Sequence, residues 1–416
     1  MHRRIAVVAL LLSGCSWSRF DDVQDDAPVV LLNAPGNVHG FGASLATVSA
    51  EGRVLVLVGG AARGANGAAL FSLGDGQSPA TDSLDAAHCG QGCFMAKSIA
   101  GLSGAQAPAS QRSSCFATGY TPSSISGTGI LVRCDEEAAT PFEYTLALPA
   151  GVSFDPAEDD LRLASDASPL PALIASAAGH AWFYAPGSLT PAELTPTTSD
   201  ASFGAAIAAR AGGFAVGAPE QAHVWLFDAT GAASACLSGP VGFGRTLAAG
   251  RVDGDGSEDL VVADGEQVHV ISGAVLAQLT DPSSCVPVQD LVTLACRSTA
   301  DLQGCGGSDF GAALAVGDID GDGDGEVFVG APGMSVRGEG SGGAVLTFDA
   351  EGQYPERLTE ARFIASAESS DRLGTSLVMA HQADRDLLVA GGSGGKAAVF
   401  YCSKLLPAAK RGSRCK

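Results

Sequence analysis

The most informative part of the sequence is "FGAALAVGDIDGDGDGEVFVGAP", residues Phe310 to Pro332. A Phe-Gly pair and an apolar run come first, then an acidic, glycine-rich loop, then a second apolar run that ends in Gly-Ala-Pro. Both runs are short and nearly continuously apolar, which is typical of strands covered on both faces. The stretch therefore predicts two buried strands joined by a strongly charged loop.

The same pattern recurs along the chain, clearly or weakly, in seven units. These begin at Phe41, Phe94, Asp160, Phe203, Phe243, Phe310 and Leu373. In each unit a third apolar run follows, so we predict three strands per unit and assign the Cys- and Ser-rich remainder to loops. Repeats of about 40 to 65 residues, each a small sheet covered on both faces, predict a β-propeller.

The Phe-Gly and Gly-Ala-Pro repeats, with "DIDGDGDGE" between them, resemble the FG-GAP repeats of integrin alpha-chain propellers. The resemblance covers residues 29–402 and implies an all-β, seven-bladed β-propeller with calcium-binding hairpin loops. In that family the two chain ends meet in one blade. The segment "VVLLNAPG", Val29 to Gly36, is therefore expected to supply the closing strand.

The acidic loop has the residue types and spacing of a site for a hard cation. Asp318, Asp320 and Asp322 occupy alternate positions, and the glycines at 321, 323 and 325 permit a tight loop. Carboxylates so spaced can converge on one point, and calcium accepts about six to eight oxygen ligands in flexible geometry. The bidentate Glu that an EF-hand needs at its twelfth position is replaced by Val329. We predict a calcium site that is not an EF-hand.

The integrin resemblance extends this ligand set to the end of the loop. It implies side-chain ligands from Asp318, Asp320, Asp322 and Glu326, and a backbone carbonyl ligand from Asp324. The last ligand is Asp in that family, whereas this chain has the longer Glu. We expect bound Ca²⁺ to stabilise the fold rather than to act as a signal.

A weaker copy of the loop, "RVDGDGSED", precedes it in the chain. Asp253, Asp255 and Asp259 are kept, but the first ligand position is Arg251. The positive charge of that arginine is an alternative to a cation, so the sequence leaves open whether this loop binds calcium.

The N-terminus has the pattern of an export signal. A basic start, His2 to Arg4, precedes an apolar run of eight residues, Ile5 to Leu12, too short to span a bilayer. The following "LSGC" resembles a bacterial lipobox. The resemblance implies a lipoprotein signal peptide at residues 1–14, cleavage before Cys15 and lipidation of that cysteine. Ser16 next to it implies an outer-membrane lipoprotein, facing the periplasm or the cell surface, with an acidic linker at residues 15–28.

The cysteines agree with export to an oxidising compartment. Of 11 cysteines, ten remain beside Cys15, an even number. Sequence alone does not fix their connectivity. Proximity along the chain suggests the disulfides Cys89–Cys93, Cys115–Cys134, Cys296–Cys305, Cys402–Cys415 and, by remainder, Cys236–Cys285.

The charge distribution limits the possible partners. The net charge of −21 argues against nucleic acid, and a basic C-terminal tail at residues 403–416 is either solvated or in contact with anionic lipid. No GxSxG, HExxH, SxxK or P-loop pattern occurs. The leading interpretation is a monomeric, calcium-stabilised adhesion or binding module for protein or polysaccharide. The alternatives are an envelope hydrolase or lyase acting at the propeller channel, and a passive scaffold.

Overall fold

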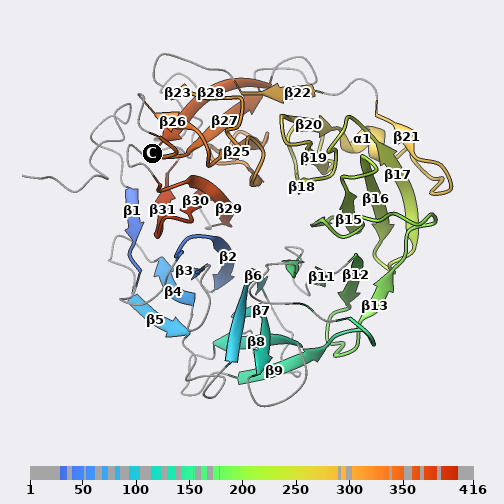
Figure 1. Cartoon of the computed structure of the whole chain (residues 1–416), viewed down its shortest axis with the longest axis horizontal. Coiled ribbons are helices and arrows are strands. Elements are labelled where there is room, and N and C mark those ends of the chain that lie inside the picture. Colours follow the sequence, from blue (N-terminus) through green and yellow to red (C-terminus); the bar gives the residue numbers. More distant parts are fainter. Residues whose placement is uncertain are drawn as a thin grey trace, which may run out of the picture.

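The described residues form a closed ring of seven β-sheets around a central axis (Figure 1). Each sheet has a four-stranded antiparallel blade, and in the fourth sheet a short fifth strand pairs in parallel with the outer strand. The structure, a computed structural model, describes residues 29–34, 40–50, 53–60, 68–73, 80–84, 93–103, 114–122, 129–135, 142–152, 154, 161–165, 172–177, 179–288, 292–296, 302–336, 340–350, 358–365, 370–381 and 386–401. The predicted signal peptide, Cys15, the acidic linker and the basic tail lie outside the described residues.

The blades follow one another in chain order, and each starts with its innermost strand. The first three contain β2 (Ser44–Ala50), β3 (Arg53–Gly59), β4 (Ala68–Leu73) and β5 (Ala80–Leu84); β6 (Cys93–Ser103), β7 (Ser114–Pro122), β8 (Gly129–Asp135) and β9 (Phe142–Ala147); and β10 (Arg162–Ser165), β11 (Leu173–Ala177), β12 (His180–Tyr184) and β13 (Ala192–Leu194).

The remaining blades contain β14 (Ala206–Arg210), β15 (Gly213–Ala218), β16 (His223–Asp228) and β17 (Ala233–Ser238); β18 (Thr246–Gly250), β19 (Asp259–Ala263), β20 (Gln267–Ile271) and β22 (Val292–Ala295); β24 (Leu314–Gly317), β25 (Glu326–Ala331), β27 (Ala344–Ala350) and β28 (Leu358–Ala365); and β29 (Leu373–His381), β30 (Asp386–Gly392), β31 (Lys396–Phe400) and β1 (Val29–Leu32). The short strand β21 (Val286–Pro287) extends the fourth sheet by pairing in parallel with β17. Helix α1 (Gly273–Leu276) and the pair β23 (Leu302–Gln303) and β26 (Ser335–Val336) lie in the connections.

The seven predicted units correspond to the seven blades, but each blade has four strands rather than three. The fourth, outermost strand was missed because it is polar or mixed, as in β9 and β13, and lacks the apolar run that marks a buried strand. In the unit that begins at Phe243, the sequence predicts loops for the Cys- and Ser-rich remainder that follows the third strand and precedes Phe310. This remainder contains β22, the fourth strand of the fifth blade, and the short strands β21 and β23.

The chain's first strand closes the ring, as expected. β1 pairs antiparallel with β31 as the outer strand of the seventh blade, with Val29 opposite Phe400 and Leu32 opposite Ala397. The chain enters and leaves the propeller through the same blade. Blade closure by strands from both ends is a general means of holding such a ring shut.

Hydrophobic cores fill the spaces between neighbouring blades. One core joins Ile174 and Phe183 of the third blade with Phe214 and Trp225 of the fourth. Every residue of the middle strands β11, β15, β19 and β25 is buried, because both faces of each sheet pack on another sheet. The prediction of strands covered on both faces is confirmed.

The recurrent Phe-Gly pair performs two packing roles. Its Phe is buried and contacts an aromatic ring from the third strand of the same blade. The contact is edge-on for Phe41 with Phe71 and for Phe310 with Phe348, whose ring centroids lie 6.0 and 6.2 Å apart. The glycine that follows has positive φ, which a residue with a Cβ rarely adopts. The pair thus anchors the start of the inner strand to its own blade.

The Phe-Gly glycine also packs against the Gly-Ala-Pro glycine of the preceding blade. A Cβ built on Gly217 would lie 2.0 Å from the carbonyl oxygen of Gly244, and one built on Gly330 would lie 2.1 Å from that of Gly374. The same contact joins the seventh blade to the first, where Gly391 would meet Gly42 at 2.1 Å. Backbone therefore touches backbone at these seams, and we call this contact the glycine lock.

Three of the suggested disulfides are present. Cys115–Cys134 joins neighbouring strands β7 and β8, Cys236–Cys285 joins β17 to the segment that leads into β21, and Cys296–Cys305 closes a loop after β22. The suggested pairs Cys89–Cys93 and Cys402–Cys415 involve side chains outside the described part of the chain.

Candidate metal centre

The acidic loop forms the connection between β24 and β25, the two inner strands of the sixth blade. Gly317 pairs with Glu326 across this hairpin, so the intervening residues must turn within a short span. Gly321 and Gly323 make the turn with φ of +78° and +105°. Glycine is required there because these are left-handed conformations that side chains disfavour.

The structure brings together the three alternating aspartates. One carboxylate oxygen each from Asp318, Asp320 and Asp322 lies within 4.8 Å of the other two. Asp320 is buried and Asp322 is exposed, so the cluster extends from the loop's interior to solvent. The residues fit a hard cation, because three converging carboxylates supply the oxygen ligands that calcium prefers and leave room for others.

Backbone amides fix the orientation of these carboxylates. Asp318 Oδ1 accepts hydrogen bonds from the amides of Gly321 at 2.6 Å and Asp322 at 3.1 Å, while its Oδ2 accepts from Gly323 at 3.2 Å. Asp320 Oδ1 accepts from the amide of Asp322 at 3.1 Å. These backbone hydrogen bonds therefore keep the carboxylates close together despite their mutual repulsion.

Glu326 lies at the buried base of the loop. Its side chain is about 1% exposed, and its Oε2 accepts a hydrogen bond from the amide of Ile319 at 2.8 Å. Burial raises the pKa of Glu326 to about 9, with further increases from the charges of Asp320, Asp349 and Asp322. A buried carboxyl in this position requires either a proton or a neighbouring cation to be stable at neutral pH.

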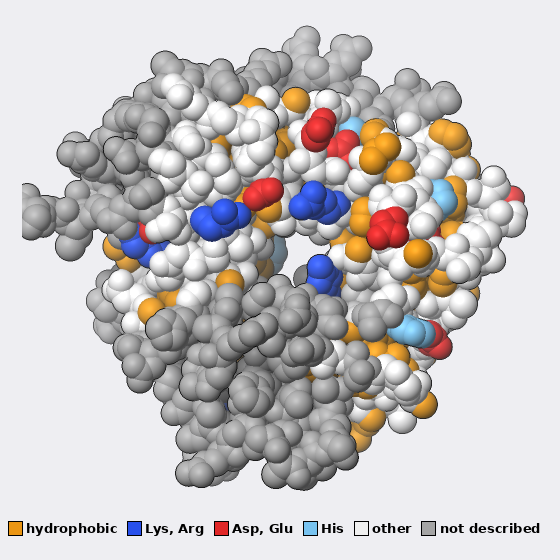
Figure 2. All heavy atoms as spheres, in the orientation of Figure 1, with side chains coloured by type: hydrophobic (Ala, Val, Ile, Leu, Met, Phe, Trp, Pro, Cys, Tyr) orange, Lys and Arg blue, Asp and Glu red, His pale blue; other side chains and the backbone are white. Residues whose placement is uncertain are grey.

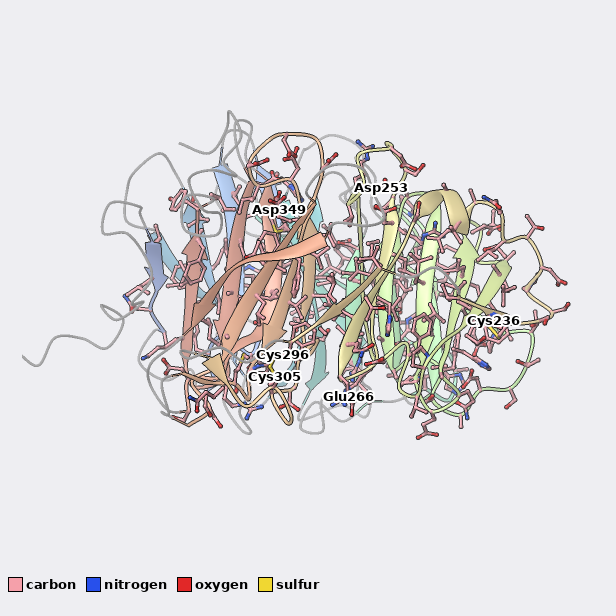
Figure 3. The ribbon with its side chains drawn as sticks, turned by 90° about the horizontal axis from the view of Figure 1, so that it is seen from above. Cys236, Asp253, Glu266, Cys296, Cys305 and Asp349 are labelled. Carbon is pink, nitrogen blue, oxygen red and sulfur yellow. A yellow bond between two sulfur atoms is a disulfide. The ribbon has the colours of Figure 1, made fainter. Side chains whose placement is uncertain are left out.

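The side chain of Asp324 is directed toward the neighbouring blade. A Cβ built on Gly254, in the weaker acidic loop, would lie 1.9 Å from Asp324 Oδ1. Partial burial raises the pKa of Asp324, and the charges of Asp322, Asp253 and Asp318 raise it further. The two acidic loops thus touch across the seam between the fifth and sixth blades, on the face opposite the turn that contains Glu266 (Figure 3).

The weaker loop is organised by the protein itself. Both oxygens of buried Asp259 accept backbone hydrogen bonds, from Val252 at 2.7 Å on one side and from Gly273 at 2.7 Å on the other. Asp253 accepts from the amide of Asp255 at 3.1 Å and from the hydroxyl of Ser272 at 3.1 Å.

The carboxylates of the weaker loop do not converge as those of the sixth blade do. Among the described residues, oxygens of Asp253, Asp255 and Asp259 are not all within 4.8 Å of one another. Arg251 is exposed. Burial raises the pKa of Asp259 to about 6.

Sequence reasoning missed the contribution of Asp349. This buried residue lies next to the end of β27, and its charge raises the pKa of Glu326 on the adjacent strand. No local motif marks it, because its position depends on the pairing of β25 with β27. The cross-strand register was the only signal that would have found it.

A second group of metal-type ligands is a disulfide with a histidine beside it. A ring nitrogen of His223 and the sulfurs of Cys236 and Cys285 lie within 4.8 Å of one another, but the two sulfurs are bonded to each other. The His223 ring nitrogen Nδ1 lies 3.1 Å from Asp200, and His269 of the next blade lies 2.9 Å from Asp264. These histidines pair with carboxylates in their own blades.

Comparison with known proteins identifies the sixth blade. The family model for the FG-GAP repeat matches residues 310–348, which contain β24, β25 and most of β27. No curated protein matches the sequence. None of the described helices has the length and apolar composition needed to cross a bilayer.

Two solved structures share the architecture. The crystal structure of BBS1N in complex with ARL6DN, soaked with lead, contains a chain with a TM-score of 0.51 and 14% identity, over 92% of this chain and 98% of that one. A streptogramin B lyase structure gives a TM-score of 0.51 and 9% identity, over 89% of this chain and 96% of that one. At these identities the likeness concerns the fold alone.

Proposed function

We propose that this seven-bladed propeller, with an FG-GAP repeat in its sixth blade, is a calcium-stabilised binding module carried on the bacterial envelope by a lipid anchor. The observation that carries the proposal is the convergence of Asp318, Asp320 and Asp322 above the buried carboxyl of Glu326. A cation held there would neutralise a loop that otherwise concentrates negative charge at a blade seam. Such a loop suits a fold whose rigidity depends on extracellular calcium.

In this proposal the residues of the sixth blade hold the ion. Asp318, Asp320, Asp322 and Glu326 supply carboxylate oxygens, and Asp324 supplies its backbone carbonyl. Calcium supplies the positive charge that keeps the hairpin closed. The ring then presents the loops at its two ends as a rigid surface for a protein or polysaccharide ligand.

Thermal unfolding against calcium tests the proposal directly. Extracellular sites bind calcium with dissociation constants of about 10⁻⁴ to 10⁻³ M, so about 10 mM calcium should stabilise the chain by roughly 1–3 kcal/mol relative to excess chelator. Asp322→Ala should lose most of this response, and Asp281→Ala, an exposed acid outside both loops, should keep it. Equal melting temperatures with calcium and with chelator would refute calcium stabilisation.

Export and lipidation are a separate part of the proposal. The lipobox-like "LSGC" and the three disulfides among the described residues support passage to an oxidising envelope compartment. The chain expressed with its own N-terminus should partition into detergent, and Cys15→Ser should move it to the aqueous phase. A Cys15→Ser chain that still partitions with detergent would contradict the anchor.

A further inference from the structure

The face of the ring that carries the Phe-Gly turns has arginines at the mouth of its central opening. Arg162 begins β10, Arg245 immediately precedes β18, and Arg372 immediately precedes β29. These are the inner strands of the third, fifth and seventh blades, so the three arginines come from alternate blades. Figure 2 shows Lys and Arg side chains beside the opening, with most of the acidic side chains farther out.

Specific contacts hold two of these arginines. The Nε of Arg162 donates a hydrogen bond at 2.5 Å to the carbonyl of Ala205 in the next blade. Arg372 forms an ion pair at 3.2 Å with Asp309 of the preceding blade. Both members of this pair have a left-handed backbone, with φ of +53° and +54°, which non-glycine residues adopt rarely. The two side chains are therefore positioned from across the seams.

Arg245 differs from the other two. Its side chain is exposed, and it makes no ion pair with any residue in the described part of the chain. Its guanidinium lies next to Gly265, where a Cβ would meet Nη1 at 3.0 Å. A positive charge with no carboxylate partner at the channel mouth is available to a ligand.

Several acids on this face already have cationic or histidine partners. Asp371 is paired with Lys396 at 3.1 Å, and Asp264 lies 2.9 Å from His269. The two acidic loops lie on the other face of the ring from the arginines. Figure 3 shows Asp253, of the weaker acidic loop, and Glu266, on the face of the arginines, at opposite ends of the blades. Because Asp309 neutralises Arg372, the positive charge of the mouth comes from Arg162 and Arg245. These arginines stand out in a chain whose net charge is −21.

We propose that this mouth binds the carboxylates of a uronate-type acidic oligosaccharide, an inference that rests on the binding function proposed above. Guanidinium groups bind carboxylates through paired, charge-assisted hydrogen bonds. Screening limits attraction and repulsion to about 8 Å at physiological salt. A narrow chain entering the mouth therefore meets the arginines, whereas a broad polyanion such as nucleic acid meets the acidic surface as well.

Titration calorimetry with a defined oligosaccharide tests this proposal on the full mature chain in calcium. The probe is tetragalacturonate, and cellotetraose is the uncharged control. Tetragalacturonate should bind and weaken as salt is raised, while cellotetraose should not bind. Arg245→Gln should reduce affinity about tenfold, the effect of losing one charge-assisted contact. Because the side chain of Arg245 is exposed, the variant should fold like the parent chain, and an unchanged urea midpoint verifies this.

Two further variants sharpen the test. Arg372→Lys keeps the charge but loses the planar fork, and should also weaken binding. Arg251→Gln removes an exposed arginine on the opposite face and should leave affinity unchanged. Equal affinity of Arg245→Gln and the parent chain, equal binding of cellotetraose, or tighter binding of tetraglutamate would each overturn the proposal. If calcium still raises the melting temperature in that case, the calcium-stabilised fold stands and only the ligand assignment fails.

Discussion

Replacing Gly330 with alanine tests the physical basis of the glycine lock. The new Cβ would lie 2.1 Å from the carbonyl oxygen of Gly374, where ordinary contact begins at 3.4 Å. The obstructing atoms are backbone, so no side chain can rotate away, and the sixth and seventh blades must separate by roughly an ångström. Overpacking of this kind costs about 1–3 kcal/mol, and we expect a value at the upper end.

Urea denaturation at fixed calcium measures this cost. The matched control is Gly306→Ala, because Gly306 is exposed, has no atom within 4 Å of a notional Cβ and does not have positive φ. Its unfolding free energy should change by no more than about 0.5 kcal/mol. Gly217→Ala, which would meet Gly244 at 2.0 Å, should resemble Gly330→Ala. The reasoning fails if Gly330→Ala unfolds at the same urea concentration as Gly306→Ala.

Three other predictions concern acidity, cross-linking and a buried hydrogen bond. Burial raises the pKa of Glu326 from 4.5 to about 9, so between these pH values the folded chain binds a proton that the unfolded chain does not. The unfolding free energy in chelator should therefore fall as the pH rises, by up to about 3 kcal/mol between pH 5 and 7. Urea titrations measure this dependence, and Glu326→Gln should flatten it. Replacing Cys236 and Cys285 with alanine opens a loop of 49 residues and should cost about 4 kcal/mol, measured by urea denaturation against the reduced and oxidised parent chain. Tyr184→Phe removes the hydroxyl that accepts from Trp182 Nε1 at 3.1 Å, leaving a buried donor unpaired, and should lower the unfolding free energy by about 1–3 kcal/mol; an unchanged urea midpoint would contradict this.

The inner part of each blade was predictable from sequence because its strands are buried on both faces. Continuous apolar runs such as "VLVLV" in β3 and "DLVVA" in β19 predict buried strands, because they recur together with Phe-Gly turns. The outer strand, such as β9 with "FEYTLA", packs on one side only and so carries no continuous apolar signal. The outer strand can be assigned only once the third strand, with which it pairs, is known.

The candidate metal centre was predictable only as far as it is local. The alternate spacing of Asp318, Asp320 and Asp322 predicted their convergence, because turn geometry within nine residues fixes it. The contact of Asp324 with Gly254 arises between blades, and no spacing within either loop encodes it. The arginines at the channel mouth are equally invisible in the sequence, because their common position follows from the arrangement of three separate inner strands.

The pairing of β1 with β31 has a consequence for biosynthesis. Val29 is among the first residues of the propeller to be made and Phe400 among the last, yet they are partners in one sheet. A chain made from its N-terminus must therefore keep β1 as an unpaired edge until nearly all of the ring has been made. Such distant pairing slows folding and exposes the nascent chain to aggregation, so the final strand acts as the step that commits the whole molecule to its native form.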